Sequence, residues 1–392
     1  MLTRPCWVEI NTRNLEQNYS FLSTLAGPQV ELLAVVKANA YGHELKICAP
    51  AVVRAGARWL GVTSVEEGIE ARRLCPESRI LVIGISQGQS NEIVRHKLTA
   101  VVWDNWQFDE LEAAALAQGI RSVPVHLEID TGMSRQGAEP DSLAPLLERF
   151  HRGSPLRLEG VMTHLFAADE ADEQNTNAQL ERMEIALKQI QSAGMQPETL
   201  NIGNSAALIA GQAIKISALA GRYGMNTLIR PGLALYGLVP QFDPDFSSDE
   251  PASLGQARSH LHPVLTWKTR VVSVKSVPTG AVIGYNGIFV ATEPMKLALI
   301  AVGYADGLDR QLGNRLSLLV RSRHAPLVGR ISMDQSVIDI TGIPSVATGD
   351  EVVLIGQQGG ESISAFDHAK AAGTIPWEIF TRIAARVPRI AI

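Results

Sequence analysis

Lys37 is the residue of this chain whose position most directly suggests chemistry. It ends the apolar run ELLAVVK (residues 31–37), and the segment ANAYGH (38–43) follows at once. A lysine at the mouth of a buried strand has a desolvated amine with a lowered pKa, so it can attack a carbonyl and form a Schiff base. A lysine that only reaches solvent from a strand end is the alternative. The residues that lie near Lys37 in the fold would distinguish a reactive lysine from a solvent-facing one.

Other polar residues follow apolar runs in the same way. They are, in chain order, Asp130, Arg135, His164, Asn204, Ser205, Arg230 and Gly232. If these runs are parallel strands of one barrel, the residues share the face that carries the chemistry in barrel enzymes. Each residue alone also has a structural interpretation, as a core histidine, a helix cap or half of an ion pair. Their joint occurrence at strand ends favours a functional site.

The last of these residues are suited to a phosphate group. In barrels, the loops after strands seven and eight often bind phosphate through backbone N–H groups. Ser205 supplies a hydroxyl, and Gly232 lets the backbone approach closely. A phosphate-bearing cofactor beside a Schiff-base lysine indicates pyridoxal 5′-phosphate (PLP), which stabilises a carbanion at the α-carbon of an amino acid.

The elements that would position these residues can be read from the periodicity. Up to about residue 240, short β-branched runs alternate with helical patterns, which is typical of parallel strands joined by crossover helices. We expect strands at 32–36, 59–63, 79–83, 100–103, 124–129, 158–163, 199–202 and 226–229. Apolar residues recur three and four apart between them, as in 65–74, 106–118 and 178–192. Eight such units predict an α/β fold, a (β/α)8 barrel of the TIM type.

The composition changes after the eighth unit. The polar segment PQFDPDFSSDEPAS (240–253) is broken by prolines and indicates a linker or surface loop. Beyond it, we expect strands at 269–277, 296–302, 316–321, 336–340 and 351–355. We therefore expect a barrel at 1–240, a linker at 241–262 and a mostly β domain at 263–392. The first ten or so residues could pack with that second domain.

Composition also restricts the partners and the compartment. With 35 Lys and Arg against 40 Asp and Glu, and a net charge of -5, the chain has no basic surplus for nucleic acid. The N-terminus lacks the apolar core of a signal peptide, and no apolar run is long enough to span a bilayer. The three cysteines are not spaced as a metal site or redox pair. We expect a cytoplasmic protein that binds a small molecule, without membrane, nucleic acid or metal.

Five motifs of the chain are distinctive: AVVKANAYGH (34–43), DTGMSR (130–135), RPGLALYG (230–237), VGYADG (302–307) and GRISMDQ (329–335). With these motifs the chain resembles the alanine racemases, a family of fold-type III PLP enzymes. These five motifs stand in the family's order, and the resemblance extends over essentially the whole chain. It implies an isomerase that interconverts L-alanine and D-alanine.

The resemblance also implies which residues hold the cofactor. Lys37 would form the Schiff base, and His164 would lie beside the ring. The other residues assigned to cofactor binding are Tyr41, Asn204, Ser205, Arg230, Gly232, Leu233 and Trp377. Arg230 would face the pyridine nitrogen, where a guanidinium can only donate, so the nitrogen stays unprotonated and the electron sink is weakened. A weak sink favours racemisation over decarboxylation.

Inversion of a stereocentre needs a proton donor on one face and an acceptor on the other. Lys37 would be one base, and Tyr285 matches the family's second base, contributed by the neighbouring subunit. Without the resemblance, Tyr285 would be interpreted as a turn aromatic. Arg135 would face the substrate carboxylate, and Met333 of the partner chain would contact the substrate. The resemblance therefore implies a homodimer with composite active sites.

Two positions depart from the family pattern. Trp377 stands where most relatives place a tyrosine that narrows the substrate entrance and touches the phosphate. An indole has one donor and no acceptor, so the substrate scope could differ. Glu128 stands where many relatives carry a carbamylated lysine that orients the arginine facing the substrate. A carboxylate there could bond Arg135 directly, and an ordinary strand-end acid is the alternative.

Three functions remain open from the sequence. The first is racemisation of alanine, with serine or a broader set of amino acids as the variant that Trp377 suggests. The second is a fold-type III decarboxylase, which Arg230 and the MDQ motif at 333–335 disfavour. The third is a PLP-binding homeostasis protein without turnover, which is typically a lone barrel. The second domain argues against it.

Overall fold

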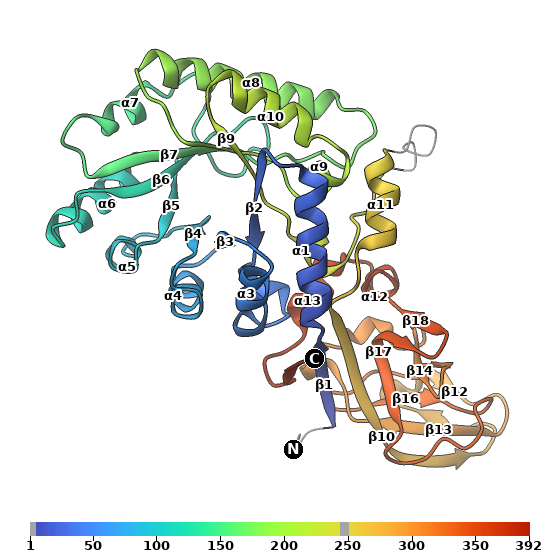
Figure 1. Cartoon of the computed structure of the whole chain (residues 1–392). Helices are drawn as coiled ribbons and strands as arrows, with labels where there is room; N and C mark the ends of the chain where they lie inside the picture. The colour runs from blue at the N-terminus through green and yellow to red at the C-terminus, as the bar shows by residue number, and fades with distance from the viewer. Residues whose placement is uncertain (1–4, 244–250) are drawn as a thin grey trace. The chain divides into compact units, whose positions relative to one another are not determined.

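The computed structural model describes residues 5–243 and 251–392 (Figure 1). The chain forms two compact units. The barrel unit comprises Arg13–Ala40 and Cys48–His262, and the β unit comprises the chain up to Thr12 together with Tyr41–Ile47 and Pro263–Ile392. The short segment Tyr41–Ile47 therefore belongs to the β unit, although it follows Lys37 closely in the sequence.

The barrel unit contains a closed parallel barrel of eight strands within the described residues. The strands are β2 (Val30–Val35), β3 (Trp59–Val62), β4 (Arg79–Val82), β5 (Thr99–Val102), β6 (Val123–Glu128), β7 (Leu156–Met162), β8 (Thr199–Asn201) and β9 (Asn226–Ile229). Pairing of β9 with β2 closes the ring. Every residue of β3 and β5 is buried, as expected of parallel strands covered on both faces. The (β/α)8 barrel predicted from the sequence is confirmed.

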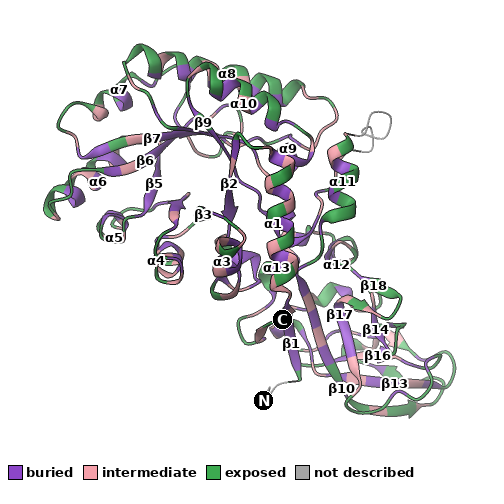
Figure 2. Ribbon diagram, viewed as in Figure 1, coloured by how far each residue is buried: buried purple, intermediate pink, exposed green. Residues whose placement is uncertain are grey.

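Helices around the barrel have buried residues on one side and exposed residues on the other, as in α8 (Figure 2). The helices are α1 (Thr12–Ala26), α3 (Leu45–Arg54), α4 (Val65–Leu74), α5 (Ser90–Arg95), α6 (Asn105–Ala117), α7 (Ala144–Leu147), α8 (Gln174–Ser192), α9 (Ser205–Ile209), α10 (Ala213–Arg222) and α11 (Ala252–His260), with 3-10 turns η1 (Glu148–Phe150) and η2 (Leu233–Tyr236). The short segment α2 (Lys37–Tyr41) has left-handed φ angles from Ala38 on, so it is a turn and not a regular α-helix. In α8, buried residues recur three and four apart from Thr176 to Ile190. In residues 5–243 and 251–392, no helix is long and apolar enough to cross a membrane.

Helix α11 corrects the expectation of an irregular linker over residues 252–260. The rest of the expected linker includes residues 244–250, which lie outside the described residues. The helix buries Leu254 and Ala257, and the ring of His260 stacks on Phe21 of α1 with centroids 5.1 Å apart. Two apolar residues three positions apart form one helical face, a pattern that the prolines and polar residues nearby obscure in the sequence.

The β unit is built on a sheet of nine strands, as far as the chain is described, with the path β15-β14-β17-β10-β1-β19. Its strands are β1 (Cys6–Ile10), β10 (Leu265–Val277), β13 (Met295–Ile300), β14 (Ser317–Val320), β15 (Arg323–Pro326), β16 (Ser336–Asp339), β17 (Glu351–Gln358), β18 (Glu361–Ile363) and β19 (Arg389–Ala391). The pair β11 (Val282–Ile283) and β12 (Phe289–Val290) forms a separate hairpin. Around them lie η4 (Tyr285–Gly287), η5 (Tyr304–Asp306), η6 (Arg310–Leu312), α12 (Ala365–Ala372) and α13 (Pro376–Arg382). The mostly β character predicted for this part is confirmed.

The two ends of the β unit's sequence meet in the sheet. Strand β1 pairs antiparallel with β10, and β19 pairs parallel with β1. The segment Tyr41–Ile47 packs here because Gly42 has a φ of 77° and approaches the carbonyl of Phe380 so closely that a side chain would not fit. The ring of His43 also packs edge-on against Phe380.

Candidate active site

The structure places six predicted site residues of the barrel unit beyond the carboxyl ends of its strands. Lys37 follows β2, His164 follows β7, Asn204 and Ser205 follow β8, and Arg230 and Gly232 follow β9. Arg135 and Leu233 lie in the same set of loops, and Glu128 is the last residue of β6. Because the strands are parallel, these ends form one rim of the barrel. Tyr41, Tyr285, Met333 and Trp377 lie in the β unit.

Lys37 has the electrostatic environment of a reactive amine. Its side chain is half-buried. Burial lowers the pKa of Lys37, and the guanidinium groups of Arg135 and Arg230 lower it further, while the carboxylate of Glu67 raises it. A lowered pKa increases the fraction of neutral amine, which is the nucleophilic form. A cofactor bound to Lys37 remains a prediction from the sequence.

Arg230 is a buried cation held by several acceptors. It is 4% exposed, and it donates to the side-chain and backbone oxygens of Asn201, to the carbonyl of Thr163 at 2.8 Å and to Nδ1 of His164 at 3.2 Å. Burial lowers the pKa of Arg230 to about 10, and Glu128 opposes this effect. The guanidinium therefore stays protonated at neutral pH and can act only as a donor.

His164 is neutral in this arrangement. Arg230 can only donate, so Nδ1 of His164 must accept, and the ring proton is on Nε2. Burial and the positive charges of Arg230, Arg135 and Lys37 lower the pKa of His164 to about 3. The imidazole thus offers a neutral N–H to a bound group rather than a positive charge.

A chain of polar contacts runs from Arg230 through the barrel interior. The side-chain oxygen of Asn201 accepts from Arg230, so its amide nitrogen faces Nδ1 of His126 at 3.2 Å. Nδ1 of His126 then accepts, and Nε2 carries the proton and lies 3.6 Å from Glu159, which is too far for a hydrogen bond. Glu159 is held by Arg79 at 2.6 Å, and its pKa is about 2 because of His126 and Arg79, although burial opposes them. These contacts in the barrel interior orient Arg230.

The loop after β6 folds back onto its own strand and displays Arg135. The side chain of Asp130 accepts from the backbone N–H groups of Gly132 and Ser134, at 2.9 and 3.0 Å. Gly137 has a φ of 120°, and a Cβ there would lie 2.5 Å from the backbone nitrogen of Asp130. Only glycine fits this approach. The loop leaves Arg135 exposed beyond the strand end.

Glu128 is bonded to Gln136. Among the hydrogen bonds of the described residues, its carboxylate accepts from Nε2 of Gln136 at 2.6 Å, and no bond to Arg135 is present, so of the two alternatives left open by the sequence the direct bond to Arg135 is not the one observed. The physical reason is that Gln136 turns toward the strand whereas Arg135 is exposed. Burial raises the pKa of Glu128 to about 7, against the effects of Gln136, Arg230 and Arg135. Glu128 is therefore half-protonated near neutral pH.

Gln179 of α8 is a supporting residue that the sequence analysis missed. Its amide donates to Oγ1 of Thr131 and to the carbonyl of His164, both at 2.9 Å, and accepts from the backbone of Phe166. It joins the loops after β6 and β7, with a further bond of 2.8 Å between Thr131 and Thr163. Asn201, His126, Glu159 and Gln136 were missed as well. The sequence signal that could have identified these residues is a polar residue at a position where the periodicity predicts a buried one.

The loops after β8 and β9 are joined by Ser205. Its hydroxyl oxygen accepts from the backbone N–H groups of Gly232 at 2.9 Å and Ala234 at 3.2 Å. Asn204 caps α9 by accepting from Ala207. The hydroxyl proton of Ser205 can still be donated to an oxygen of a bound group. Ser205, Gly232 and Leu233 therefore lie together, with the N–H of Gly232 donated to Ser205 in this structure.

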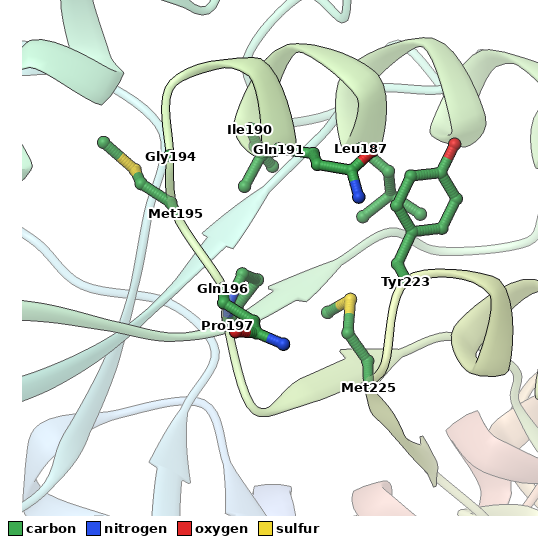
Figure 3. A pocket seen from close by; sticks show the side chains of 9 residues that line it. All are labelled: Leu187, Ile190, Gln191, Gly194, Met195, Gln196, Pro197, Tyr223 and Met225. Atoms are coloured by element: carbon green, nitrogen blue, oxygen red, sulfur yellow. The ribbon is translucent and has the colours of Figure 1, made fainter.

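A hollow of about 270 Å³ lies elsewhere in the barrel unit (Figure 3). It is lined by Leu187, Ile190, Gln191, Gly194, Met195, Gln196, Pro197, Tyr223 and Met225. These residues come from the end of α8 and from the segments that precede β8 and β9, so the hollow is at the amino ends of those strands. Tyr223 is its one titratable lining residue, and burial raises the pKa of that phenol. The candidate active site is therefore the rim at the carboxyl ends.

Comparison with known proteins shows the family of the chain. The N-terminal domain of alanine racemase matches residues 10–240, and its C-terminal domain matches residues 264–391. The chain belongs to the alanine racemase family. An alanine racemase of Symbiobacterium thermophilum is 39% identical over 390 residues, which are 98% of this chain and 97% of that protein. The family predicted from the sequence is confirmed.

Two solved structures extend the comparison. Alanine racemase from Bacillus anthracis with bound L-Ala-P superimposes with a TM-score of 0.87 at 33% identity, over 100% of this chain and 96% of that one. Alanine racemase from Bartonella henselae with covalently bound pyridoxal phosphate has a TM-score of 0.82 at 26% identity, covering 99% of each chain. The chain thus has the full architecture of the alanine racemases, an isomerase family.

Replacement of Asn201 with alanine tests the chain of contacts below Arg230. The variant leaves a buried guanidinium with fewer acceptors and leaves Nδ1 of His126 without its donor. We expect the free energy of unfolding to fall by about 2–4 kcal/mol, measured by urea denaturation. Asn175→Ala, which removes an exposed amide, is the control and should cost less than about 0.5 kcal/mol. A loss below about 1 kcal/mol for Asn201→Ala would contradict the structural role.

Glu128→Gln tests the raised pKa of Glu128. An acid whose pKa is about 7 in the folded protein, against 4.5 ordinarily, destabilises the fold as pH rises from 4.5 to 7. The full effect, up to about 3 kcal/mol, is present above pH 7. In the cofactor-free protein, Glu128→Gln should therefore gain stability relative to wild type between pH 5 and pH 8, in urea unfolding at each pH. The exposed control Glu139→Gln should show no such trend.

Proposed function

We propose that this chain is a PLP-dependent racemase that interconverts L-alanine and D-alanine. The observation that carries the proposal is the gathering of Lys37, Arg135 and Arg230 at one barrel rim. These cations act on one another and lower the pKa of Lys37. A phosphate and a substrate carboxylate would balance this positive charge, so the residues fit PLP with an amino acid. Membership in the alanine racemase family points to the same pair of ligands.

The cofactor would be held at both ends. Lys37 would carry it covalently, and Ser205, Gly232 and Leu233 would hold the phosphate, supported by Asn204. His164 would lie beside the ring. Tyr41 and Trp377 are further proposed cofactor contacts, both from the β unit. When bound, PLP supplies an electron sink that makes the α-proton of an amino acid acidic.

Arg230 would face the pyridine nitrogen and select the reaction. Because its pKa is about 10 and it can only donate, it would leave that nitrogen unprotonated. The resulting weak sink favours return of a proton over loss of the carboxyl group, which argues for racemisation rather than decarboxylation. The hydrogen bonds that Arg230 donates to the carbonyls of Asn201 and Thr163 would hold the guanidinium in this orientation.

Two side chains would move the proton. Nζ of Lys37 would act on one face of the substrate, and the phenol oxygen of Tyr285 from a neighbouring subunit would act on the other. Arg135 would bind the substrate carboxylate through paired donors. Met333 of the partner would contact the substrate. This arrangement makes the enzyme a homodimer with composite active sites.

The surface around Tyr285 supports the dimer. Tyr285 is 64% exposed, Met333 is 54% exposed, and Val282, Ile288 and Val290 near the tyrosine are exposed as well. Large apolar side chains that gather on a surface in this way mark interfaces. A second copy of the chain would cover them and receive both residues in its own active site.

Trp377 supports a second candidate, racemisation of serine or of a broader set of amino acids. It lies half-buried in α13, where an indole offers one donor and no acceptor. A cytoplasmic location is proposed as well, because the sequence has only three cysteines in 392 residues, whereas disulfide-dense chains are typical of oxidising compartments. D-alanine formed there would supply reactions that consume the D-enantiomer.

Racemisation itself can be measured by chiral chromatography of the PLP-loaded protein given L-alanine and, separately, L-serine. We expect D-alanine to appear faster than D-serine, and Lys37→Ala to lose both the activity and the visible absorbance of the bound cofactor. Faster turnover of serine would establish the second candidate. An unchanged absorbance band in Lys37→Ala would mean that another lysine carries the cofactor.

Subunit complementation tests the composite site. Lys37→Ala and Tyr285→Phe should each lower activity at least about 100-fold, because each removes one base. A mixed dimer has one intact site, with Lys37 from one subunit and Tyr285 from the other. Random reassembly of equal amounts should therefore restore about a quarter of wild-type activity. No recovery, with mixed dimers demonstrated by mass spectrometry, would contradict the proposal.

A further inference from the structure

The chain adopts a strained backbone immediately after Lys37. Ala38, Asn39, Ala40 and Tyr41 have φ angles of 52°, 53°, 56° and 53°, so four consecutive residues other than glycine form a left-handed turn. This conformation is unfavourable for L-residues, because Cβ comes too close to the following carbonyl oxygen. Such strain persists only when neighbouring groups hold the backbone in place. The turn determines where the chain leaves Lys37, so whatever holds it also holds the lysine.

Glu67, in the first turn of α4, is a side chain that holds this turn, beside the hydrogen bond of 2.8 Å from the N–H of Ala40 to the carbonyl of Val36. One oxygen of its carboxylate accepts from the backbone N–H of Asn39 at 2.9 Å. The other oxygen accepts from the backbone N–H groups of Thr63 at 3.2 Å and Ser64 at 3.5 Å, and Ser64 in turn accepts from the N–H of Glu67. A capping box requires only the bonds to Ser64. The bond to Asn39 joins the end of β2 to the end of β3.

We propose that Glu67 is a positioning residue for Lys37, whose carboxylate bridges two strand ends and maintains the left-handed turn that follows the lysine. The inference rests on the role of Lys37 proposed above. Helix α4 would thereby help to position Lys37 through the side chain of Glu67, which does not touch the reacting atoms.

The charge of Glu67 has a second effect on the lysine. The charged and titratable groups that act on Lys37 from the surrounding loops are Arg135, Arg230, His164 and Glu67. Arg135 and Arg230 favour the neutral amine, His164 is neutral, and Glu67 favours the protonated amine. Glu67 therefore limits how far the pKa of Lys37 falls. Loss of its charge shifts that balance toward the neutral amine.

Glu67→Gln tests both effects, because an amide has nearly the same shape but one acceptor oxygen and no charge. Glu66→Gln is the matched control, since Glu66 is in the same helical turn, is exposed and carries the same charge. The protein is studied without cofactor. The pH dependence of Lys37 acylation, followed by mass spectrometry, reports its pKa. Hydrogen exchange of the Asn39 amide reports the turn.

In Glu67→Gln we expect the pKa of Lys37 to fall by about half a unit or more and exchange at Asn39 to accelerate at least about tenfold. Glu66→Gln should change neither. If both properties of Glu67→Gln equal those of wild type, or if Glu66→Gln changes them equally, the proposal is wrong.

Two further variants separate strain from charge and from simple helix capping. Glu67→Asp keeps the charge with a shorter reach, so exchange at Asn39 should accelerate while the pKa of Lys37 changes less than in Glu67→Gln. Unchanged exchange in Glu67→Asp overturns the proposal even if Glu67→Gln does not fold. Ala38→Gly relieves the left-handed strain. Added to Glu67→Asp, it should raise the melting temperature more than it does when added to Glu66→Gln. Equal recovery would leave Glu67 as a helix cap only.

Borohydride reduction of the PLP-loaded protein, followed by peptide mapping, distinguishes the two proposals. Trapping of the cofactor on another lysine would refute the assigned role of Lys37 but leave the exchange and pKa results intact. Trapping on Lys37, with unaltered exchange at Asn39 in the Glu67 variants, would refute only the role of Glu67.

Discussion

A guanidinium buried at the barrel rim is the constraint on which the rest of the site depends. A buried charge is tolerated only where acceptors surround it, and Arg230 finds them in Asn201, Thr163 and His164. Each acceptor must then turn its oxygen or its unprotonated nitrogen toward Arg230. Because Asn201 turns its oxygen to Arg230, its amide nitrogen faces His126, and because His164 accepts, it remains neutral. One cation thus determines the tautomers of two histidines and the orientation of an amide.

The rim carries an excess of positive charge. Lys37, Arg135 and Arg230 act on one another, and burial raises the pKa of the buried acid Glu128 to about 7, which weakens the negative charge that would oppose them. A rim of this kind attracts groups that bring negative charge, which suits a phosphate at the Ser205 end and a carboxylate beside Arg135. The same cations increase the neutral fraction of Lys37. Binding of anions and reactivity of the amine therefore have one electrostatic origin.

The geometry around Lys37 depends on strain as well as charge. A left-handed turn of four residues after the lysine is unfavourable by itself, and it survives because the ends of β2 and β3 are joined across it. Barrel closure makes the ends of β2 and β3 rigid, since each strand is paired with a neighbour on both sides. The loop that follows Lys37 is therefore anchored to two fixed strand ends.

Much of this protein could be predicted from the sequence, because the signals were local. Alternation of β-branched runs with helical periods predicted the eight strands and helices of the barrel, and polar residues at the ends of those runs predicted Lys37, His164, Ser205 and Arg230. The motif matches predicted the alanine racemase family. Each of these inferences uses about ten neighbouring residues, over which propensity and periodicity act.

Contacts between distant residues were decided only by the tertiary structure. His126 and Asn201 are 75 positions apart, Arg230 and Thr163 are 67 apart, and Asn39 and Glu67 are 28 apart. Barrel closure brings such residues together, and no local pattern encodes which of them meet. For the same reason Glu128 pairs with Gln136 rather than Arg135, because the path of a folded loop, and not charge alone, selects its partner. The sequence by itself determined the elements and the chemical types at the rim, and the closed barrel determined their partners.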